Sequence, residues 1–208
     1  MTEPEKVSKA RINFEEATWD VYHLFDIHDE LVSKINVPKK KEKANILVRS
    51  TYLFITACWE SYVEDLCDEA LSFLLRKTIK GRNWISGVLK KHKKDLIHVF
   101  NTPRSKNINE LYLATIGLTN LSNSWRWRGM TTSQSQSRLG NYIDKRGAIA
   151  HRTKTSQSIS RKDSEEYLEL IKILVNKTER HVQSYVKRIT GMNFGEKGGI
   201  RIWLGKKK

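Results

Sequence analysis

Apolar residues recur at helical spacing through most of the chain, and no segment of useful length shows the alternation typical of a β-strand. Residues 8 to 36 predict an amphipathic helix whose apolar positions lie near a 3.6-residue period: Ile12, Trp19, Tyr22, Phe25 and Ile27. Pro38 predicts that this helix has ended, and the basic residues Lys39 to Lys43 predict a solvated turn after it. The pattern therefore predicts an all-α protein.

The second predicted helix is the longest and the most apolar. It runs from Ala44 to about Lys77, and one stripe of its surface carries large apolar residues at helical spacing: Val48, Ile55, Trp59, Tyr62, Leu66, Phe73 and Leu74. We expect Trp59, Tyr62 and Leu66 to lie in the core, because a stripe of this width on one helix has to be buried against other helices.

Four further helices follow in the prediction, over residues 84 to 100, 108 to 121, 138 to 151 and 163 to 189. The polar segment Thr131 to Ser137 is expected to be a loop or the start of a helix, and Ser164, Glu165 and Glu166 suggest the N-terminus of the last one. The sequence thus predicts one helical domain over residues 1–190 and a loosely attached, basic, Gly- and Lys-containing tail over residues 191–208.

The net charge indicates what kind of molecule the protein binds. The 208 residues carry 38 Lys and Arg against 23 Asp and Glu, which gives a formal net charge of +15 at pH 7. A surplus of this size favours a polyanionic partner, nucleic acid first and an acidic membrane surface second. Much of it lies in two basic segments, Leu71 to Lys106 and Arg126 to Lys162; the lysines from Lys90 to Lys94 are either a solvated face or a site of RNA capture.

Several classes of protein are not indicated. The longest apolar run, from Tyr52 to Trp59, is far shorter than the roughly 20 residues that span a bilayer. The first 30 residues are acidic and lack the apolar segment of a signal peptide. Cys58 and Cys67 would lie on opposite sides of one helix, where they cannot pair with each other. We therefore expect a cytoplasmic protein without a membrane partner, and the histidine spacings predict neither a metal site nor a cofactor.

One arginine stands out in the second basic segment. If residues 139 to 151 are helical, Arg146 falls within about 20° of the apolar stripe that Leu139 begins. A guanidinium group there requires a carboxylate, a phosphate or a partner subunit to offset its charge. His151 is turned about 140° from Arg146 around the helix, but it shares a side with Asp144, which could orient or polarise it.

These residues resemble a known motif. The segment from Arg146 to His151, Arg-Gly-Ala-Ile-Ala-His, resembles the Arg-x4-6-His signature of HEPN domains. Upstream, the segment Ala57 to Leu66 resembles the A-W-E-x-Y-V-E-D-L second helix of one HEPN subgroup, and the segments around Gly117 and Trp125 resemble the region that precedes the motif. The resemblance implies an antiparallel helical bundle of the HEPN type with helical insertions, which dimerises so that two motif copies face each other.

The resemblance also implies a function. Many HEPN proteins are metal-independent endoribonucleases, often of toxin–antitoxin or anti-phage systems, and others are inactive domains that bind RNA or nucleotides. Active members frequently carry Asn, Asp or His directly after the motif arginine, whereas this chain has Gly147. The helper role is therefore missing, moved to Asp144, or filled by another residue.

The residue types suit metal-free RNA cleavage, which needs proton transfer and a charge that holds phosphate. Histidine titrates near neutral pH, and arginine holds two phosphate oxygens at once. We therefore expect Arg146 to hold the phosphate, His151 to transfer a proton, Asp144 to support it, and a second set of basic residues to bind RNA: Lys145, Arg152, Lys154, Arg126 and Arg128.

Other interpretations stay open at this stage. His151 could simply be a histidine favoured at a helix C-terminus, and Arg146 could pair with a carboxylate of a partner chain. Trp125 and Trp127 could stack on bases or anchor a loop. The whole protein could be a homodimeric ribonuclease with an antitoxin or defence-system partner, a non-catalytic HEPN module that binds RNA, a nucleotide or a protein, or a basic adaptor.

Overall fold

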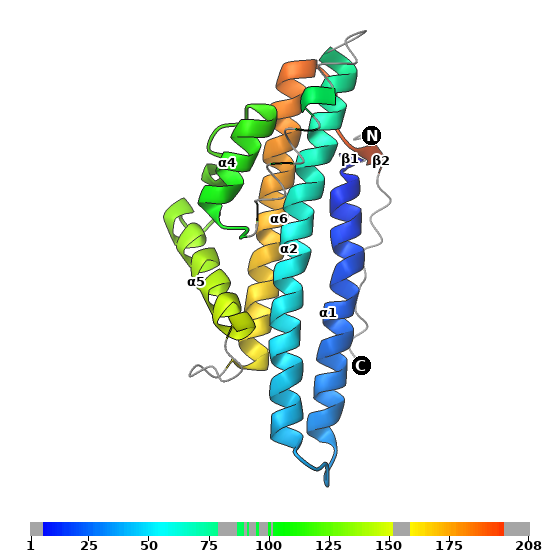
Figure 1. Ribbon diagram of the computed structural model, residues 1–208, viewed down its shortest axis with the longest axis vertical. Coiled ribbons are helices and arrows are strands. Elements are labelled where there is room, and N and C mark those ends of the chain that lie inside the picture. The colour runs from blue at the N-terminus through cyan, green and yellow to red at the C-terminus, as the bar shows by residue number, and fades with distance from the viewer. Residues whose placement is uncertain are drawn as a thin grey trace.

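A computed structural model describes residues 6–78, 87–89, 91, 95, 100, 102–151 and 159–197. The protein is all-α, as the hydrophobic pattern predicts, and long helices packed side by side make up most of it (Figure 1). The elements in chain order are β1 (Lys6–Val7), α1 (Lys9–Ser33), α2 (Lys40–Thr78), α4 (Ser105–Ile116), the 3-10 turn η1 (Leu121–Ser124), α5 (Thr132–His151), α6 (Arg161–Thr190) and β2 (Glu196–Lys197).

Helix α2 is the centre of the bundle. It packs against α1 on one side and against α6, α4 and α5 on the others. Trp59, Tyr62 and Leu66 are fully buried on it, which confirms that this stripe is core. The indole Nε1 of Trp59 donates to the carbonyl oxygen of Pro103 at 3.1 Å, so even the polar atom of this side chain has a partner.

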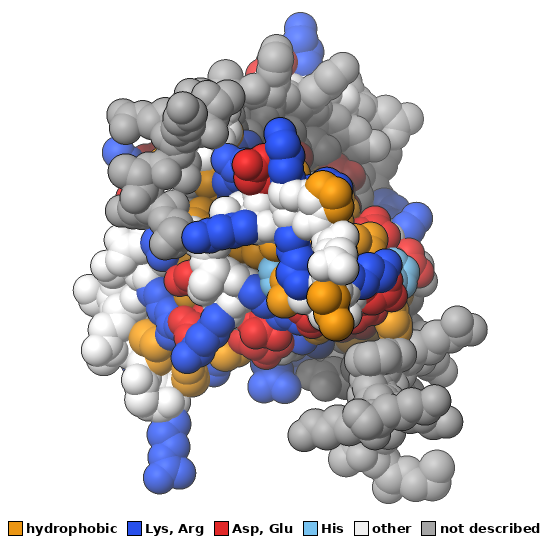
Figure 2. Space-filling view, turned by 90° about the horizontal axis from the view of Figure 1, so that it is seen from below, with side chains coloured by type: hydrophobic (Ala, Val, Ile, Leu, Met, Phe, Trp, Pro, Cys, Tyr) orange, Lys and Arg blue, Asp and Glu red, His pale blue; other side chains and the backbone are white. Residues whose placement is uncertain are grey.

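Helices α1 and α2 form an antiparallel hairpin that extends beyond α5 and α6 (Figure 1). Helix α2 begins at Lys40, so most of the stretch Lys39 to Lys43 belongs to the helix and the expected solvated turn is shorter than predicted. Seen from this end, Lys and Arg side chains lie among acidic and apolar ones rather than in one continuous patch (Figure 2). No helix among the described residues is long and apolar enough to cross a bilayer.

Helix α6 is defined at both ends by local sequence. Ser160 is its N-cap: its hydroxyl accepts from the backbone N–H of Asp163, whose carboxylate accepts in return from the Ser160 backbone N–H. Gly191 ends the helix in the left-handed conformation. The helix therefore begins at Arg161, two residues before the predicted start at residue 163, and Ser164, which the sequence suggested as part of its N-terminus, is buried inside the helix.

The two ends of the described chain meet beside α6. Strands β1 and β2 pair antiparallel, and the backbone N–H and hydroxyl of Ser8 both donate to the buried carboxylate of Glu179, at 2.6 and 2.8 Å. Phe194 is buried against Phe73. The beginning of the segment expected to be a loosely attached tail thus packs on the helical body, and residues from 198 onwards lie outside the described residues.

Candidate active site on helix α5

Helix α5 begins with a capping box. Thr131 is its N-cap: the Thr131 hydroxyl accepts from the Gln134 backbone N–H, and the Gln134 side chain accepts from the Thr131 backbone N–H. Ser135 is fully buried, and its hydroxyl donates to the carbonyl oxygen of Trp125 at 2.6 Å. The polar segment from Thr131 to Ser137 is therefore mostly helix, and α5 starts at Thr132 rather than near residue 138.

Three tyrosines set the rotation of α5 about its axis. The rings of Tyr142 on α5 and Tyr167 on α6 stack with centroids 4.4 Å apart, and the ring of Tyr52 on α2 lies 4.9 Å from that of Tyr167. The phenol oxygen of Tyr167 lies 3.1 Å from Oγ1 of Thr56 on α2. Burial raises the pKa of Tyr167 well above its usual range, so this phenol stays protonated as a structural hydrogen-bonding group.

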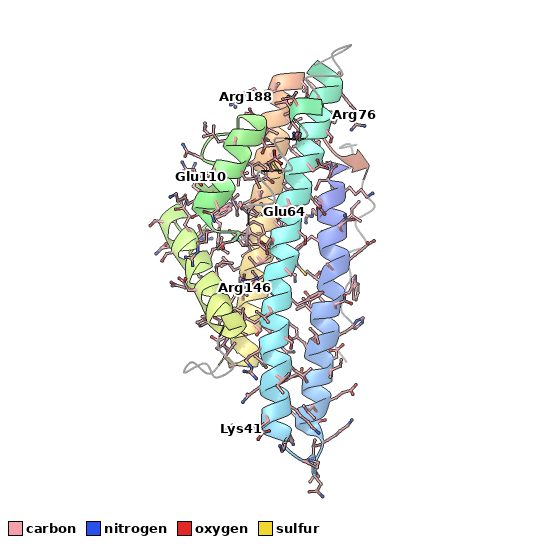
Figure 3. The ribbon with its side chains drawn as sticks, viewed as in Figure 1. Lys41, Glu64, Arg76, Glu110, Arg146 and Arg188 are labelled. Carbon is pink, nitrogen blue, oxygen red and sulfur yellow. The ribbon has the colours of Figure 1, made fainter. Side chains whose placement is uncertain are left out.

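Arg146 lies one helical turn after Tyr142 and is therefore brought to the side of α5 next to α2 (Figure 3). It is half-buried, and its charge acts on Glu60 of α2 and on Tyr167. Within the part of the chain that the structure describes, the Arg146 guanidinium makes no hydrogen bond or ion pair. Among the described residues, Glu60 is thus the carboxylate whose charge interacts with that of Arg146.

Glu60 belongs to the α2 segment that resembles a HEPN subgroup. The sequence did not predict that its charge interacts with that of Arg146. It lies about 100° around α2 from Trp59, at the border of the apolar stripe, and is half-buried. Burial raises the pKa of its carboxyl group, and the nearby charge of Arg146 offsets only part of that effect. In the sequence, the signal for this residue is that a glutamate stands at the edge of a stripe of buried apolar residues. The sequence of α2 alone does not identify the residue with which it interacts.

Asp144 has a different partner from the one that the helical spacing suggested. Its carboxylate pairs with Arg104, which precedes α4, and the Arg104 side chain passes close to Gly140 of α5. His151 is the last residue of α5, two turns beyond Asp144. Support of His151 by Asp144 remains a prediction, and it would require Asp144 to contact both residues.

The expected RNA-binding residues fall into three groups. Lys145 lies against α6, with its Nζ 3.6 Å from an Asp163 carboxylate oxygen and 5.9 Å from the centre of the Tyr142 ring. Arg126 and Arg128 are exposed. Arg152 and Lys154 lie outside the described residues, as do Lys90, Lys93 and Lys94. Lys145 thus links two helices, whereas Arg126 and Arg128 are accessible to a ligand.

The segment before α5 forms an open surface hollow of about 680 Å³, lined by Arg126, Trp127, Met130, Thr131, Thr132 and Ser133. A short turn shapes it, because Trp127 and Met130 exchange backbone hydrogen bonds of 3.1 and 3.0 Å across Gly129. Trp127 is half-buried at its edge. Trp125, two residues earlier, is fully buried and donates its indole N–H to the Thr178 hydroxyl, so it belongs to the core.

A helical bundle centred on α2, with an Arg-x4-His motif at the end of a shorter helix packed beside it, is the arrangement that the HEPN class of proteins implies. The chain matches the family model described as RiboL-PSP-HEPN over residues 15–184, which is most of its length, and it belongs to this family. Comparison with curated proteins and with solved structures gave no match.

Proposed function

We propose that this protein is a metal-independent endoribonuclease that cleaves single-stranded RNA by attack of a ribose 2′-OH on the adjacent phosphate. The main support for this proposal is the environment of the Arg146 side chain. A half-buried guanidinium with a carboxylate nearby, but with no direct hydrogen bond or ion pair among the described residues, has its donors available for phosphate oxygens.

In this reaction Arg146 holds the charge that develops on the phosphorane, and His151 transfers a proton. The products are a 2′,3′-cyclic phosphate and a 5′-hydroxyl end. Arg146 and His151 are five positions apart, which corresponds to about 140° around α5, so the proposal assigns the two groups at one phosphate to different subunits. A two-fold dimer that brings two α5 helices together supplies Arg146 from one subunit and His151 from the other.

In this proposal, the basic segment that contains the motif binds the RNA backbone. The exposed Arg126 and Arg128 neutralise phosphates, and the face of Trp127 offers a stacking platform for a base beside the hollow. The cellular role that follows is that of a toxin or an anti-phage effector, whose activity would be controlled by a partner protein.

A second candidate function is supported by Gly147. A family member that lacks a polar side chain after the motif arginine could be a non-catalytic module that binds RNA, a nucleotide or a protein with the same face. A side chain added at Gly147 would meet no other atom within 4 Å among the described residues. The position is thus open, and no neighbour from the described part of the chain fills the place that a helper side chain would occupy.

The deciding experiment is a cleavage assay on end-labelled single-stranded RNA in EDTA, with analysis of the product ends. We expect wild-type protein to cleave, and we expect His151→Ala to lower kcat by about 10²- to 10⁴-fold while keeping RNA affinity. Arg146→Ala should lose a similar factor. Arg188→Ala removes an exposed arginine of α6 at the far end of the bundle (Figure 3) and serves as the matched control with unchanged activity.

Metal-dependent cleavage, or full activity of His151→Ala, would contradict this mechanism. Binding of RNA by the wild type without cleavage would favour the second candidate.

A further inference from the structure

A groove between α1 and α2 has no part in the proposed RNA site. Its volume is about 270 Å³, and its wall is largely apolar. Alanines from both helices, Ala10, Ala17 and Ala57, line it and leave space that larger side chains would fill. Covering apolar surface of this kind lowers the free energy, so the groove suits an apolar segment.

The chain that follows β2 starts beside this groove. Strand β2 pairs antiparallel with β1, so that Glu196 lies opposite Val7. Val7 is followed three residues later by Ala10, which lines the groove. Figure 1 shows the strand pair beside the first turns of α1. Residue 198 therefore follows β2 only a few residues' length away from the groove.

Close packing fixes this starting point. Phe194 is buried, and the centre of its ring lies 5.6 Å from that of Phe73 on α2. Gly195 has a φ of +107°, and a Cβ built there would lie 2.6 Å from the carbonyl oxygen of Val7. Only glycine lets the chain pass β1 at this distance. The chain therefore enters the segment 198–208 from a well-defined position.

We propose that residues 200–204 bind in the groove between α1 and α2 as an extended segment. Because β2 is antiparallel to β1, the chain leaves β2 in the direction away from α1 and has to turn back. Gly198 and Gly199 follow at this point, and glycine adopts the positive φ angles that tight turns require. The proposal does not depend on the ribonuclease function.

The segment matches the groove in pattern and in length. Alternate side chains of an extended segment point to one side, and here these are Ile200, Ile202 and Leu204. They span about 13 Å, at about 3.3 Å per residue. The groove follows α1 from Ala10 to Ala17, which is about 10 Å at a rise of about 1.5 Å per residue. Three aliphatic side chains can thus cover its apolar wall.

Charge favours the same pairing. Residues 198–208 contain no acidic residue and four basic ones: Arg201, Lys206, Lys207 and Lys208. Among the described residues that line the groove none is basic, whereas Asp65 lines it and is exposed. Asp20 is also exposed, and it lies on the same side of α1 as the groove residue Asn13, seven positions earlier. These carboxylates attract a basic segment and repel RNA.

The two cysteines of α2 provide the test, because Cys58 lines the groove and Cys67 is fully buried in the core. Alkylation of Cys58 in the whole chain is compared between wild type and the triple variant Ile200→Ser, Ile202→Ser and Leu204→Ser. We expect Cys58 of the variant to react about 10-fold faster, because the bound segment covers the thiol. Cys67 should stay unreactive in both, which excludes general unfolding as the cause. Trp203→Ser is the matched control with wild-type reactivity, since its side chain points away from the groove.

A disulfide experiment identifies the occupant of the groove. Under mild oxidation, the new thiol of Ile202→Cys should form a disulfide with Cys58 of the same chain, as mass spectrometry can show, whereas that of Trp203→Cys should not. A disulfide that joins two chains would mean that a second copy occupies the groove, and would overturn the assignment. Equal reactivity of Cys58 in wild type and the triple variant would overturn the proposal altogether. Neither experiment uses RNA, so both results are independent of the proposed ribonuclease function.

Discussion

At the scale of single residues, Trp125 and Trp127 show how two similar neighbours come to have different roles. Both belong to a basic segment and are candidates for stacking on bases. Trp125 is fully buried, packs edge-on against Trp59 at 5.9 Å and uses its N–H within the core. Trp127 lies at the rim of the hollow beside Arg126. Only the second can meet a ligand.

This difference predicts opposite effects of two alanine variants. Trp127→Ala should weaken binding of single-stranded RNA by about 1–3 kcal/mol, the usual value of one stacked base, and should lower stability less than Trp125→Ala because Trp127 is only half-buried. Trp125→Ala should lower the free energy of unfolding by about 3–5 kcal/mol. Fluorescence anisotropy and urea unfolding measure the two quantities. Trp19→Ala, at a partly exposed tryptophan of α1, is the control, and an equal loss of RNA affinity there would contradict a stacking role for Trp127.

At the scale of elements, the cores of the helices follow the hydrophobic period, whereas their ends depend on caps. Helices α5 and α6 both begin earlier than the apolar pattern indicates, because the capping boxes at Thr131 and Ser160 lie in polar sequence. Asp163 has a double function: it closes the α6 box, and its carboxylate also lies near Lys145 of α5. An ion pair thus connects the start of α6 to α5, the helix that carries the motif.

The cap predicts a stability difference that depends on pH. The hydrogen bond from the Ser160 hydroxyl lowers the pKa of Asp163, with further contributions from the Ser160 backbone N–H and Lys145. Because the pKa of Asp163 is lower in the folded state, its carboxylate contributes to folding stability above the unfolded pKa, about 3.9. This contribution is lost as pH falls through the folded pKa. Asp163→Asn should therefore be less stable than wild type at pH 7, and the gap should close at acidic pH.

Denaturant unfolding at several pH values measures this gap. Ser160→Ala should cost about 1 kcal/mol at pH 7, as is usual for a lost N-cap. Glu169→Gln, an exposed carboxylate in the same helix, is the control for removing one charge. A gap between Asp163→Asn and wild type that widens towards low pH would contradict the assignment.

At the scale of the whole molecule, the proposed active site draws on two chains. One α5 helix presents Arg146 towards α2, and its His151 lies about 140° further around the helix axis. The divergence is fixed within a chain, because the tyrosine stack and the buried Ser135 hold α5 in one rotation. The proposed dimer has its two-fold axis beside α5, where the arginine of one subunit joins the histidine of the other.

This arrangement predicts complementation between two inactive variants. Random mixing of Arg146→Ala and His151→Ala chains makes about half of the dimers mixed, and each mixed dimer has one complete site. The mixture should recover about a quarter of wild-type activity, whereas each variant alone stays inactive. Subunits must exchange for this test, which sedimentation of differently labelled chains can establish. Exchange without recovery would mean that Arg146 and His151 act within one chain.

The all-α class, the identity of the core stripe on α2 and the Arg-x4-His motif follow from the sequence by itself, because helical periodicity and spacing are local properties of the chain. Which carboxylate interacts with the charge of Arg146, and which tryptophan is buried, depend on the packing of residues far apart in sequence. Glu60 precedes Arg146 by more than 80 positions, and no local pattern links them. The stacking of Tyr52, Tyr142 and Tyr167, which come from three different helices, helps to set the rotation of α5 and so the side of the helix on which Arg146 lies.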